Sequence, residues 1–276
     1  MRSSNYKSNP VSDQGAVNRA FSKQSRHYDE DDQGNVILQN MRQQVYAHIQ
    51  AYLKPGSHIL ELNAGTGIDA LYLANSGHWV HATDLSTGMI TQIEKRVNTP
   101  TAAGRISVQQ LSYDRLDELK GMEFDYVFSN FGGLNCLQDL SVVTTQLSQL
   151  LRKGSYVTFV VMPRVYLWEL LWIIKGQFKK ALRRLNKNGV MAHLEGEYFK
   201  TYYHSLSAIR RAFPPTFEFI RSEGLCTISP PPGSHQFAPK HPAVYRQLKK
   251  GDRLLRRVFP FNRWADHIIV TFRLKS

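Results

Sequence analysis

Short apolar runs alternate with amphipathic stretches between residues 58 and 162. The apolar runs are 58–62, 79–82, 106–109, 124–129 and 156–162, and the amphipathic stretches between them are 69–74, 87–97, 115–119 and 140–151. Apolar runs of this length that alternate with helical patterns are typical of β–α–β units. The pattern therefore predicts an α/β fold with a doubly wound, mostly parallel sheet and helices on both faces.

Two helical patterns precede the first apolar run. Apolar residues recur at helical spacing over residues 36–53, and residues 17–28 show a shorter pattern of the same kind. Four consecutive acids at 29–32 predict a turn between the two helices. We therefore assign residues 1–54 to an N-terminal helical lid and residues 55–276 to the main domain.

The alternation breaks after residue 162. Residues 165–185 form one long helical pattern with a basic end, followed by a helix-and-loop region to residue 204. We expect residues 163–204 to be a helical cap inserted after the fifth strand. Residues 234–262 predict a basic helical insertion, and residues 268–274 alternate apolar and polar side chains as a closing strand does.

Basic residues are concentrated in the second half of the chain. The whole chain carries 35 Lys and Arg against 22 Asp and Glu, a formal net charge of +13. Residues 164–276 hold 21 of the basic and seven of the acidic residues, a net of +14, which leaves a net of −1 for residues 1–163. An excess confined to one half indicates an anionic partner or a solubilising surface.

The basic stretches at 175–187 and 246–257 lie beside apolar faces. Basic amphipathic helices of this kind can lie at an anionic membrane surface. Solvated helix faces explain the same pattern, so a peripheral membrane contact is one of two open interpretations.

Several classes of protein are excluded by the rest of the composition. Cys136 and Cys226 form no C-x-x-C pair, which argues against disulfide scaffolds, zinc ribbons and iron–sulfur sites. Residues 1–10 are polar and lack the apolar core of a secretory signal. The most apolar stretch, residues 165–174, is too short to span a bilayer and contains Glu169. We expect a cytoplasmic protein without a metal site.

A glycine-rich turn follows the first apolar run. The sequence from 58 to 67 is HILELNAGTG, a strand that leads into a turn with Gly65 and Gly67. Glycines permit a tight turn and a close approach of a ligand to the backbone. Asp84 stands just beyond the second strand, where a carboxylate accepts hydrogen bonds from the ribose hydroxyls of a nucleoside. The combination predicts a nucleoside cofactor.

Three segments resemble motifs of the class I S-adenosylmethionine-dependent methyltransferases. They are ELNAGTG at 61–67, ATDLS at 82–86 and FDYVFSNF at 124–131. The resemblance covers about residues 21–272, and residues 21–29 are similar to the lid of the small-molecule members, including those that act in quinone biosynthesis. It implies S-adenosylmethionine as cofactor, S-adenosylhomocysteine as product, and a Rossmann-like sheet of seven strands with the cap after the fifth.

The resemblance also implies which residues contact the cofactor. These are Tyr28, Glu61, Asn63, Ala64, Gly65, Gly67, Asp84, Leu85, Met89, Ser112, Tyr113, Asn130 and Phe131. Asn63 replaces the family's usual first glycine, and asparagine tolerates a left-handed backbone better than other residues with a side chain. Ser112 stands near the position where the family often has an acid that contacts adenine.

No catalytic dyad, nucleophile elbow or P-loop is apparent in the sequence. Methyl transfer is an in-line displacement at an activated sulfonium, so the protein mainly positions two reactants and excludes water. An acceptor with a removable proton benefits from a general base. His193, Tyr202, Tyr203 and His204 in the cap are candidates for a base or an acceptor contact, with structural packing as the alternative for each.

We predict methyl transfer to a small-molecule acceptor that is anionic, aromatic or lipophilic. The basic second half leaves nucleic-acid methylation as an alternative, which predicts salt-sensitive binding of RNA or DNA. Nucleic acid is disfavoured because no binding module is recognisable and because Ser-Asn-Phe-Gly at 129–132 lacks the N/D-P-P-Y pattern of enzymes that methylate base amines. A third alternative is a non-catalytic protein that binds S-adenosylmethionine as a scaffold.

Overall fold

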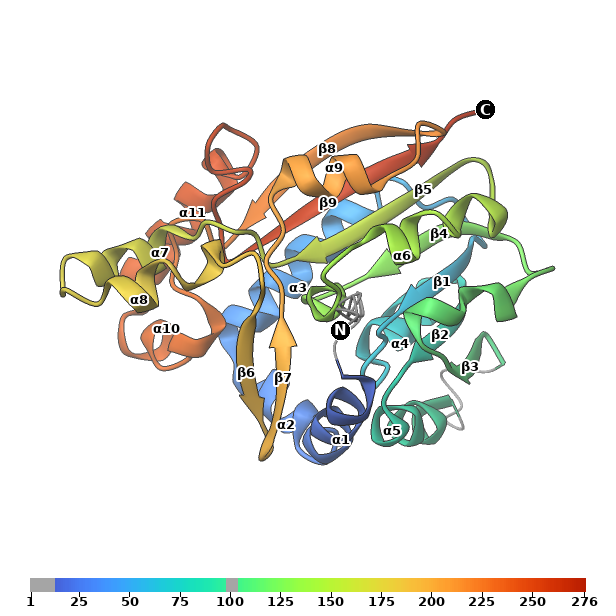
Figure 1. The fold of residues 1–276 in the computed structure, drawn as a ribbon, viewed down its shortest axis with the longest axis horizontal. Helices are drawn as coiled ribbons and strands as arrows, with labels where there is room; N and C mark the ends of the chain where they lie inside the picture. Colours follow the sequence, from blue (N-terminus) through green and yellow to red (C-terminus); the bar gives the residue numbers. More distant parts are fainter. Residues whose placement is uncertain (1–12, 98–103) are drawn as a thin grey trace, which may run out of the picture.

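A sheet of seven strands forms the centre of the molecule (Figure 1). The structure is a computed structural model that describes residues 13–97 and 104–276, so the polar stretch at 1–10 lies outside the described residues. The strand order is β3–β2–β1–β4–β5–β9–β8. The strands are β1 (His58–Leu62), β2 (Trp79–Asp84), β3 (Ile106–Gln110), β4 (Phe124–Ser129), β5 (Leu151–Val161), β8 (Phe217–Leu225) and β9 (His267–Leu274).

The pairing confirms the predicted Rossmann-like topology. Strands β1 to β5 pair in parallel, and β9 is antiparallel to both of its neighbours, β5 and β8. All five apolar runs of the first half are strands of this sheet. Because the carboxyl ends of β1, β2 and β4 meet at one edge, the polar residues that follow these strands are brought together there.

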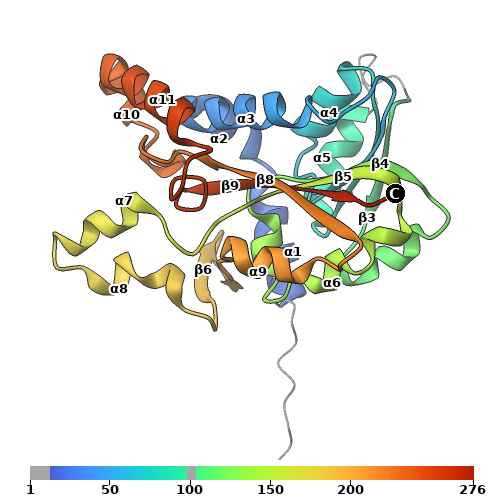
Figure 2. The ribbon, with the colours of Figure 1, turned by 90° about the horizontal axis from the view of Figure 1, so that it is seen from above.

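Helices cover both faces of the sheet (Figure 2). One face carries α3 (Val36–Ile49), α4 (Ile68–Asn75), α10 (Phe237–Lys240) and α11 (Pro242–Leu255), and the other carries α6 (Ser141–Thr144) and α9 (Leu206–Ala212). The remaining helices of the first half are α1 (Gln14–Gln24), α2 (Tyr28–Gly34) and α5 (Thr87–Val97). Short 3-10 turns are η1 (Tyr113–Leu119), η2 (Gly133–Cys136), η3 (Leu147–Gln149) and η6 (Pro232–Ser234).

The core has one apolar layer on each face of the sheet. Ile59 and Leu60 are adjacent in β1, and both are fully buried, in the two different layers. Successive strand residues point to opposite faces, so a strand covered on both sides has to be apolar throughout. This burial explains why the apolar runs in the sequence are continuous.

The apolar stripe that the sequence predicts for helix α3 is the face of the helix that packs on the sheet. The side chain of Asn35 accepts hydrogen bonds from the backbone N–H groups of Ile37 and Leu38, at 3.2 Å each, and so caps the first turn. The buried stripe that packs on the sheet consists of Ile37, Met41, Val45 and Ile49. The helix ends at Ile49, a turn earlier than residues 36–53 predicted.

The cap differs from the sequence prediction in two ways. The prediction of a single helix over residues 165–185 is wrong. The segment instead forms four short elements, which are α7 (Leu167–Leu170), η4 (Leu171–Ile173), α8 (Phe178–Ala181) and η5 (Arg183–Leu185). Gly176, with φ +69°, lies between η4 and α8 in the left-handed region, which does not continue a helix.

The second difference is a β-hairpin where helix and loop were expected. It consists of β6 (Val190–Leu194) and β7 (Glu197–Thr201), and it packs beside α1. Glu195 and Gly196 form its two-residue turn, with φ values of +52° and +79°, which are the left-handed angles that this hairpin turn requires.

The acidic run at 29–32 also differs from the prediction. It lies in helix α2 rather than in a turn, and the side chain of Asp32 is buried. Across residues 13–97 and 104–276, no helix combines the length and the apolar character needed to cross a membrane.

Candidate functional site

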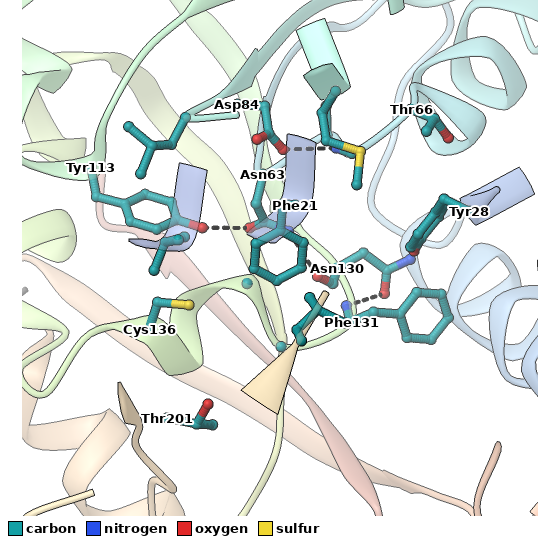
Figure 3. Close-up of a pocket in the computed structure, with 18 of the residues that line it drawn as sticks. Phe21, Tyr28, Asn63, Thr66, Asp84, Tyr113, Asn130, Phe131, Cys136 and Thr201 are labelled. Carbon is teal, nitrogen blue, oxygen red and sulfur yellow. Dashed lines mark hydrogen bonds between the residues drawn. The ribbon is translucent and has the colours of Figure 1, made fainter. Parts of the chain in front are cut away.

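A cavity of about 360 Å³ lies at the carboxyl ends of β1, β2 and β4 (Figure 3). Open α/β sheets bind ligands at this edge, and the volume is in the range of small-molecule sites. Residues predicted from the sequence that line it are Tyr28, Asn63, Ala64, Gly65, Asp84, Leu85, Met89, Ser112, Tyr113, Asn130, Phe131 and His193. Glu61 and Gly67 are not among the lining residues.

Asn63 connects the glycine-rich turn to neighbouring elements. Its backbone is left-handed, with φ +48°. Its side-chain amide donates to the carbonyl of Asn130 at 2.8 Å, and its side-chain oxygen accepts from the hydroxyls of Tyr113, at 3.1 Å, and Ser129. A Cβ atom on Gly133 would lie 2.3 Å from the Asn63 side chain, so the glycine there makes room for the amide. The asparagine therefore keeps the turn and ties β1 to β4.

Asp84 is fixed by backbone groups at the end of β2. One carboxylate oxygen accepts from the N–H of Gly65 at 2.9 Å, and the other accepts from the N–H of Ser86 at 2.8 Å. Burial raises the pKa of Asp84 to about 6, although these two hydrogen bonds lower it. An ionised carboxylate has about four acceptor positions, so the Asp84 carboxylate can still accept from hydroxyl groups of a ligand.

Glu61 lies in β1 with 1% of its surface exposed. Burial, together with the negative charge of Asp69, raises the pKa of its carboxyl well above the usual value. Its Oε2 atom has no hydrogen-bond partner among the described residues, and the same is true of the Ser112 hydroxyl on the cavity wall. Unsatisfied buried polar atoms of this kind fit a site that is completed by a polar ligand.

Arg42 of α3 is a lining residue that the sequence did not suggest. One of its guanidinium nitrogens donates to Asp32 of α2 at 2.6 Å, and another donates to Asp69 of α4. Asp69 also accepts from the side-chain amide of Asn130 at 2.8 Å. The guanidinium lies 4.8 Å from the centre of the Phe131 ring. The signal in the sequence was an arginine on an apolar helix face, with no indication of which carboxylates it would meet.

The lid and the hairpin close over the cavity together. The rings of Phe21 in α1 and Phe199 in β7 are 5.7 Å apart. Outside the cavity, Glu197 of the hairpin pairs with Lys23 of α1 at 2.8 Å and with Arg19 of α1 at 3.0 Å. Hairpin and lid residues that line the cavity and were not predicted from the sequence are Gln14, Val17, Phe21, Ala192, Leu194, Phe199 and Thr201.

Of the four candidate catalytic residues, only His193 borders the cavity. Its ring stacks on that of the exposed Tyr198, 4.4 Å away, on the outer side of the hairpin. Tyr202 and His204 are buried outside the cavity lining, and burial lowers the pKa of His204 to about 4. The ring of Tyr203 faces the guanidinium of Arg184 at 5.0 Å. The structure therefore brings Tyr202, Tyr203 and His204 into the packing of the cap.

A second buried arginine lies behind the cavity. The guanidinium of Arg184 in η5 donates to Glu169 of α7 at 2.8 Å and to Asp266 at 3.1 Å. The carboxylate of Asp266 also forms a hydrogen bond with the Nδ1 atom of His267 at 2.8 Å. His267 and Arg184 both lower the pKa of Asp266. A Cβ atom on Gly132, which lines the cavity, would lie 3.4 Å from the Nε2 atom of His267.

Comparisons with known proteins identify a methyltransferase domain in this chain. Residues 59–154 match the sequence profile of a methyltransferase domain. A demethylmenaquinone methyltransferase of Leptospira interrogans is 25% identical over 170 residues, which are 60% of this chain and 68% of the relative. That of Corynebacterium efficiens is 44% identical over 52 residues, 19% of this chain and 22% of the relative.

Solved structures share the fold at low sequence identity. An S-adenosylmethionine-dependent methyltransferase of Methanosarcina mazei has a TM-score of 0.54 at 16% identity and covers 82% of this chain and 96% of its own. A phosphoethanolamine N-methyltransferase of Haemonchus contortus, in complex with S-adenosylmethionine, has a TM-score of 0.52 at 18% identity and covers 85% of this chain and 52% of its own.

Residues 59–154 form a methyltransferase domain, and the sheet and the cavity agree with the class I S-adenosylmethionine-dependent methyltransferases that the sequence motifs resemble. Within that class the chain resembles the members that act in quinone biosynthesis. The sequence motifs imply S-adenosylmethionine as cofactor, which is the molecule bound in the Haemonchus contortus structure of the same fold.

Proposed function

We propose that this methyltransferase acts on a small aromatic or lipophilic acceptor. The observation that carries the proposal is the covered cavity, because α1 and the β6–β7 hairpin close over it and line it with apolar side chains. Figure 3 shows Asp84 at one side of this cavity and Thr201 at the other, with the ring of Phe21 between them. A covered apolar chamber suits a small molecule better than a nucleic-acid strand. The names of the relatives, demethylmenaquinone methyltransferases, support an aromatic acceptor.

In this proposal Asp84 and the glycine-rich turn hold the cofactor. The free acceptor positions of the Asp84 carboxylate suit ribose hydroxyls, and nothing lies within 4 Å of the place where a Cβ on Gly65 would be, so a ligand can approach the backbone there. Ser112 offers an unsatisfied hydroxyl on the cavity wall. The other predicted lining residues form the walls.

When bound, the cofactor would supply a methyl group activated by a sulfonium, with S-adenosylhomocysteine as the leaving group when the acceptor bonds to the methyl carbon. The chain's own contribution is to orient the acceptor and to exclude water. Phe131, Phe199 and Met162 surround the acceptor side with apolar surface.

A proton that leaves the acceptor requires a base near the cavity. We assign this role to His267, which lies beside Gly132 but outside the cavity lining: Asp266 holds its Nδ1 atom, and its Nε2 atom would lie 3.4 Å from a Cβ on Gly132. The geometry resembles other catalytic histidines that are oriented by a carboxylate. We expect His267→Asn to lower turnover about a hundredfold with unchanged affinity for S-adenosylhomocysteine, and His193→Ala to leave turnover within about twofold. Equal turnover in the wild type and His267→Asn would remove this assignment.

The acceptor class is tested with methyl-labelled S-adenosylmethionine. The purified protein is incubated with a demethylated naphthohydroquinone and, separately, with RNA. We expect label in the quinone and none in the RNA, with the signal lost in Asp84→Ala and kept in Asp117→Ala, whose carboxylate is exposed. Label in RNA alone would contradict the proposed acceptor class, and a protein that binds the cofactor but labels no acceptor would support the scaffold alternative.

A further inference from the structure

The segment from α7 to η5, residues 167–185, projects from one end of the molecule and is called here the α7–η5 lobe. Figures 1 and 2 show it at the same end in two perpendicular views. Large apolar side chains are exposed on it, above all Ile174 at 82% and Phe178 at 57% exposed. Leu171, Ile173, Leu182 and Leu185 are also exposed. Clustered apolar residues on a protein surface usually mark a site of protein or membrane interaction.

The charges around these apolar side chains are positive. The lobe and the residues that follow it carry Lys175, Lys179, Lys180, Arg183, Arg184 and Lys187. Glu169 is the only acid between residues 164 and 194, and it is buried between Arg183, at 2.7 Å, and Arg184, at 2.8 Å. The four lysines are exposed and form no ion pair within the described ranges, so the surface of the lobe presents cations that no acid neutralises.

We propose that the α7–η5 lobe docks the protein on an anionic lipid bilayer. Ile174 and Phe178 enter the boundary between headgroups and acyl chains, while the lysines contact lipid phosphates. Nucleic acid would match the lysines and leave the exposed aliphatic and aromatic side chains in water. An anionic bilayer is the partner that matches both the positive charge and the apolar surface.

The lobe is a fixed part of the molecule. Arg184 joins it to Asp266 at the start of the sheet's antiparallel strand, and Trp168 donates a hydrogen bond from its indole nitrogen to the carbonyl of Ile228 at 3.0 Å. The chain continues from the lobe directly into the hairpin that covers the cavity. Docking of the lobe would thus bring the cover of the cavity close to the bilayer, from which a lipophilic acceptor is available. That last consequence rests on the proposed function, whereas the docking does not.

Vesicle co-sedimentation tests the docking without any methyl acceptor. The full chain is mixed with vesicles of phosphatidylcholine alone or with about a third phosphatidylglycerol. We expect binding to the anionic vesicles, and about a tenfold loss in the variant Ile174→Asp/Phe178→Asp. A single charge reversal, Lys179→Glu, should weaken binding severalfold. Lys179 is exposed and has no hydrogen bond or ion pair within the described ranges.

Matched controls separate docking from folding. Met122→Asp changes an exposed apolar residue just before β4, at the sheet edge opposite the cavity, and should bind vesicles like the wild type. All variants should keep the wild-type affinity for S-adenosylhomocysteine, so a loss of vesicle binding cannot be attributed to a lost fold or cofactor site.

Three results would overturn the docking. They are no binding to anionic vesicles, equal binding to neutral vesicles, and wild-type binding by both lobe variants. RNA binding in a gel shift without vesicle binding would likewise overturn it, because the lobe would then serve a nucleic acid.

Discussion

Each half of the chain contains a buried arginine that joins carboxylates from two elements. Arg42, 3% exposed, joins Asp32 of the lid to Asp69 of α4, and Arg184, 4% exposed, joins Glu169 of the lobe to Asp266. Arg42 lines the cavity, in a half whose charges balance. Arg184 lies behind the cavity, in the half that holds the whole basic excess.

The comparison separates two tasks. In the first half, the buried ion pairs assemble the wall of the cavity around the carboxyl edge of the sheet. In the second half, similar ion pairs attach the lobe to Asp266 just before β9, while the lysines of the lobe face solvent. The basic excess is therefore concentrated in the half that contains the lobe, and the proposed cofactor site does not need it.

Replacement of Arg42 should have the largest effect. Arg42→Met leaves the buried carboxylates of Asp32 and Asp69 without their counter-charge, which costs about 3–5 kcal/mol of unfolding free energy. Affinity for S-adenosylhomocysteine should fall as well, because the cavity wall loosens. Urea denaturation and calorimetric titration measure the two effects. Arg246→Met, at an exposed position of α11, is the control and should change stability by less than about 0.5 kcal/mol.

Replacement of Arg184 should cost less, about 2–3 kcal/mol, because each carboxylate keeps one partner. Glu169 retains Arg183, and Asp266 retains His267. Affinity for S-adenosylhomocysteine in Arg184→Met should stay within about twofold of the wild type. A loss of affinity as large as that in Arg42→Met would contradict the claim that only Arg42, and not Arg184, supports the cavity wall.

The affinity for S-adenosylhomocysteine, which we propose binds at Asp84 in the first half, should also depend on pH. Burial raises the pKa of Asp84 to about 6, and only the ionised carboxylate offers all of its acceptor positions. Affinity for S-adenosylhomocysteine should therefore be constant above about pH 7 and fall about tenfold by pH 5, as the carboxyl becomes protonated. Titrations over this range test it, and a flat profile for the wild type would contradict the role of Asp84.

The smallest effect is expected at the contact between lid and hairpin. Glu197→Gln removes the ion pairs with Arg19 and Lys23, which are exposed and screened by salt. S-adenosylhomocysteine should dissociate about two- to threefold faster, measured by stopped flow, and less so at high salt. A dissociation rate that does not change at low salt would show that the ion pairs do not hold the cover.

Much of the first half could be predicted because local pattern and tertiary structure agree there. Continuous apolar runs indicate buried parallel strands, and the order of strand, glycine turn and Asp84 fixes the site at one sheet edge. The role of Arg42 could not be predicted, because its partners Asp32 and Asp69 are joined to it only by the packing of three helices. The helix at 28–34 was missed for the same reason, since its acids suggested an exposed turn.

The cap was less predictable because local signals there were misleading. Residues 165–185 have helical spacing, but the left-handed Gly176 divides them. The turn Glu195-Gly196 lacks the Asn-Gly or Asp-Gly signature of tight hairpins, so the hairpin was not expected. Tyr202, Tyr203 and His204 were chosen by residue type, although the first and last are buried and the ring of Tyr203 packs against Arg184.

The central claim is that the carboxylate of Asp84 holds the cofactor in the electrically neutral half. Calorimetric titration of S-adenosylhomocysteine into the wild type, Asp84→Ala and Asp117→Ala tests it most directly. We expect Asp84→Ala to weaken binding about a hundredfold, through the loss of hydrogen bonds to a charged acceptor, and Asp117→Ala to bind like the wild type. Unchanged binding by a folded Asp84→Ala protein would contradict it.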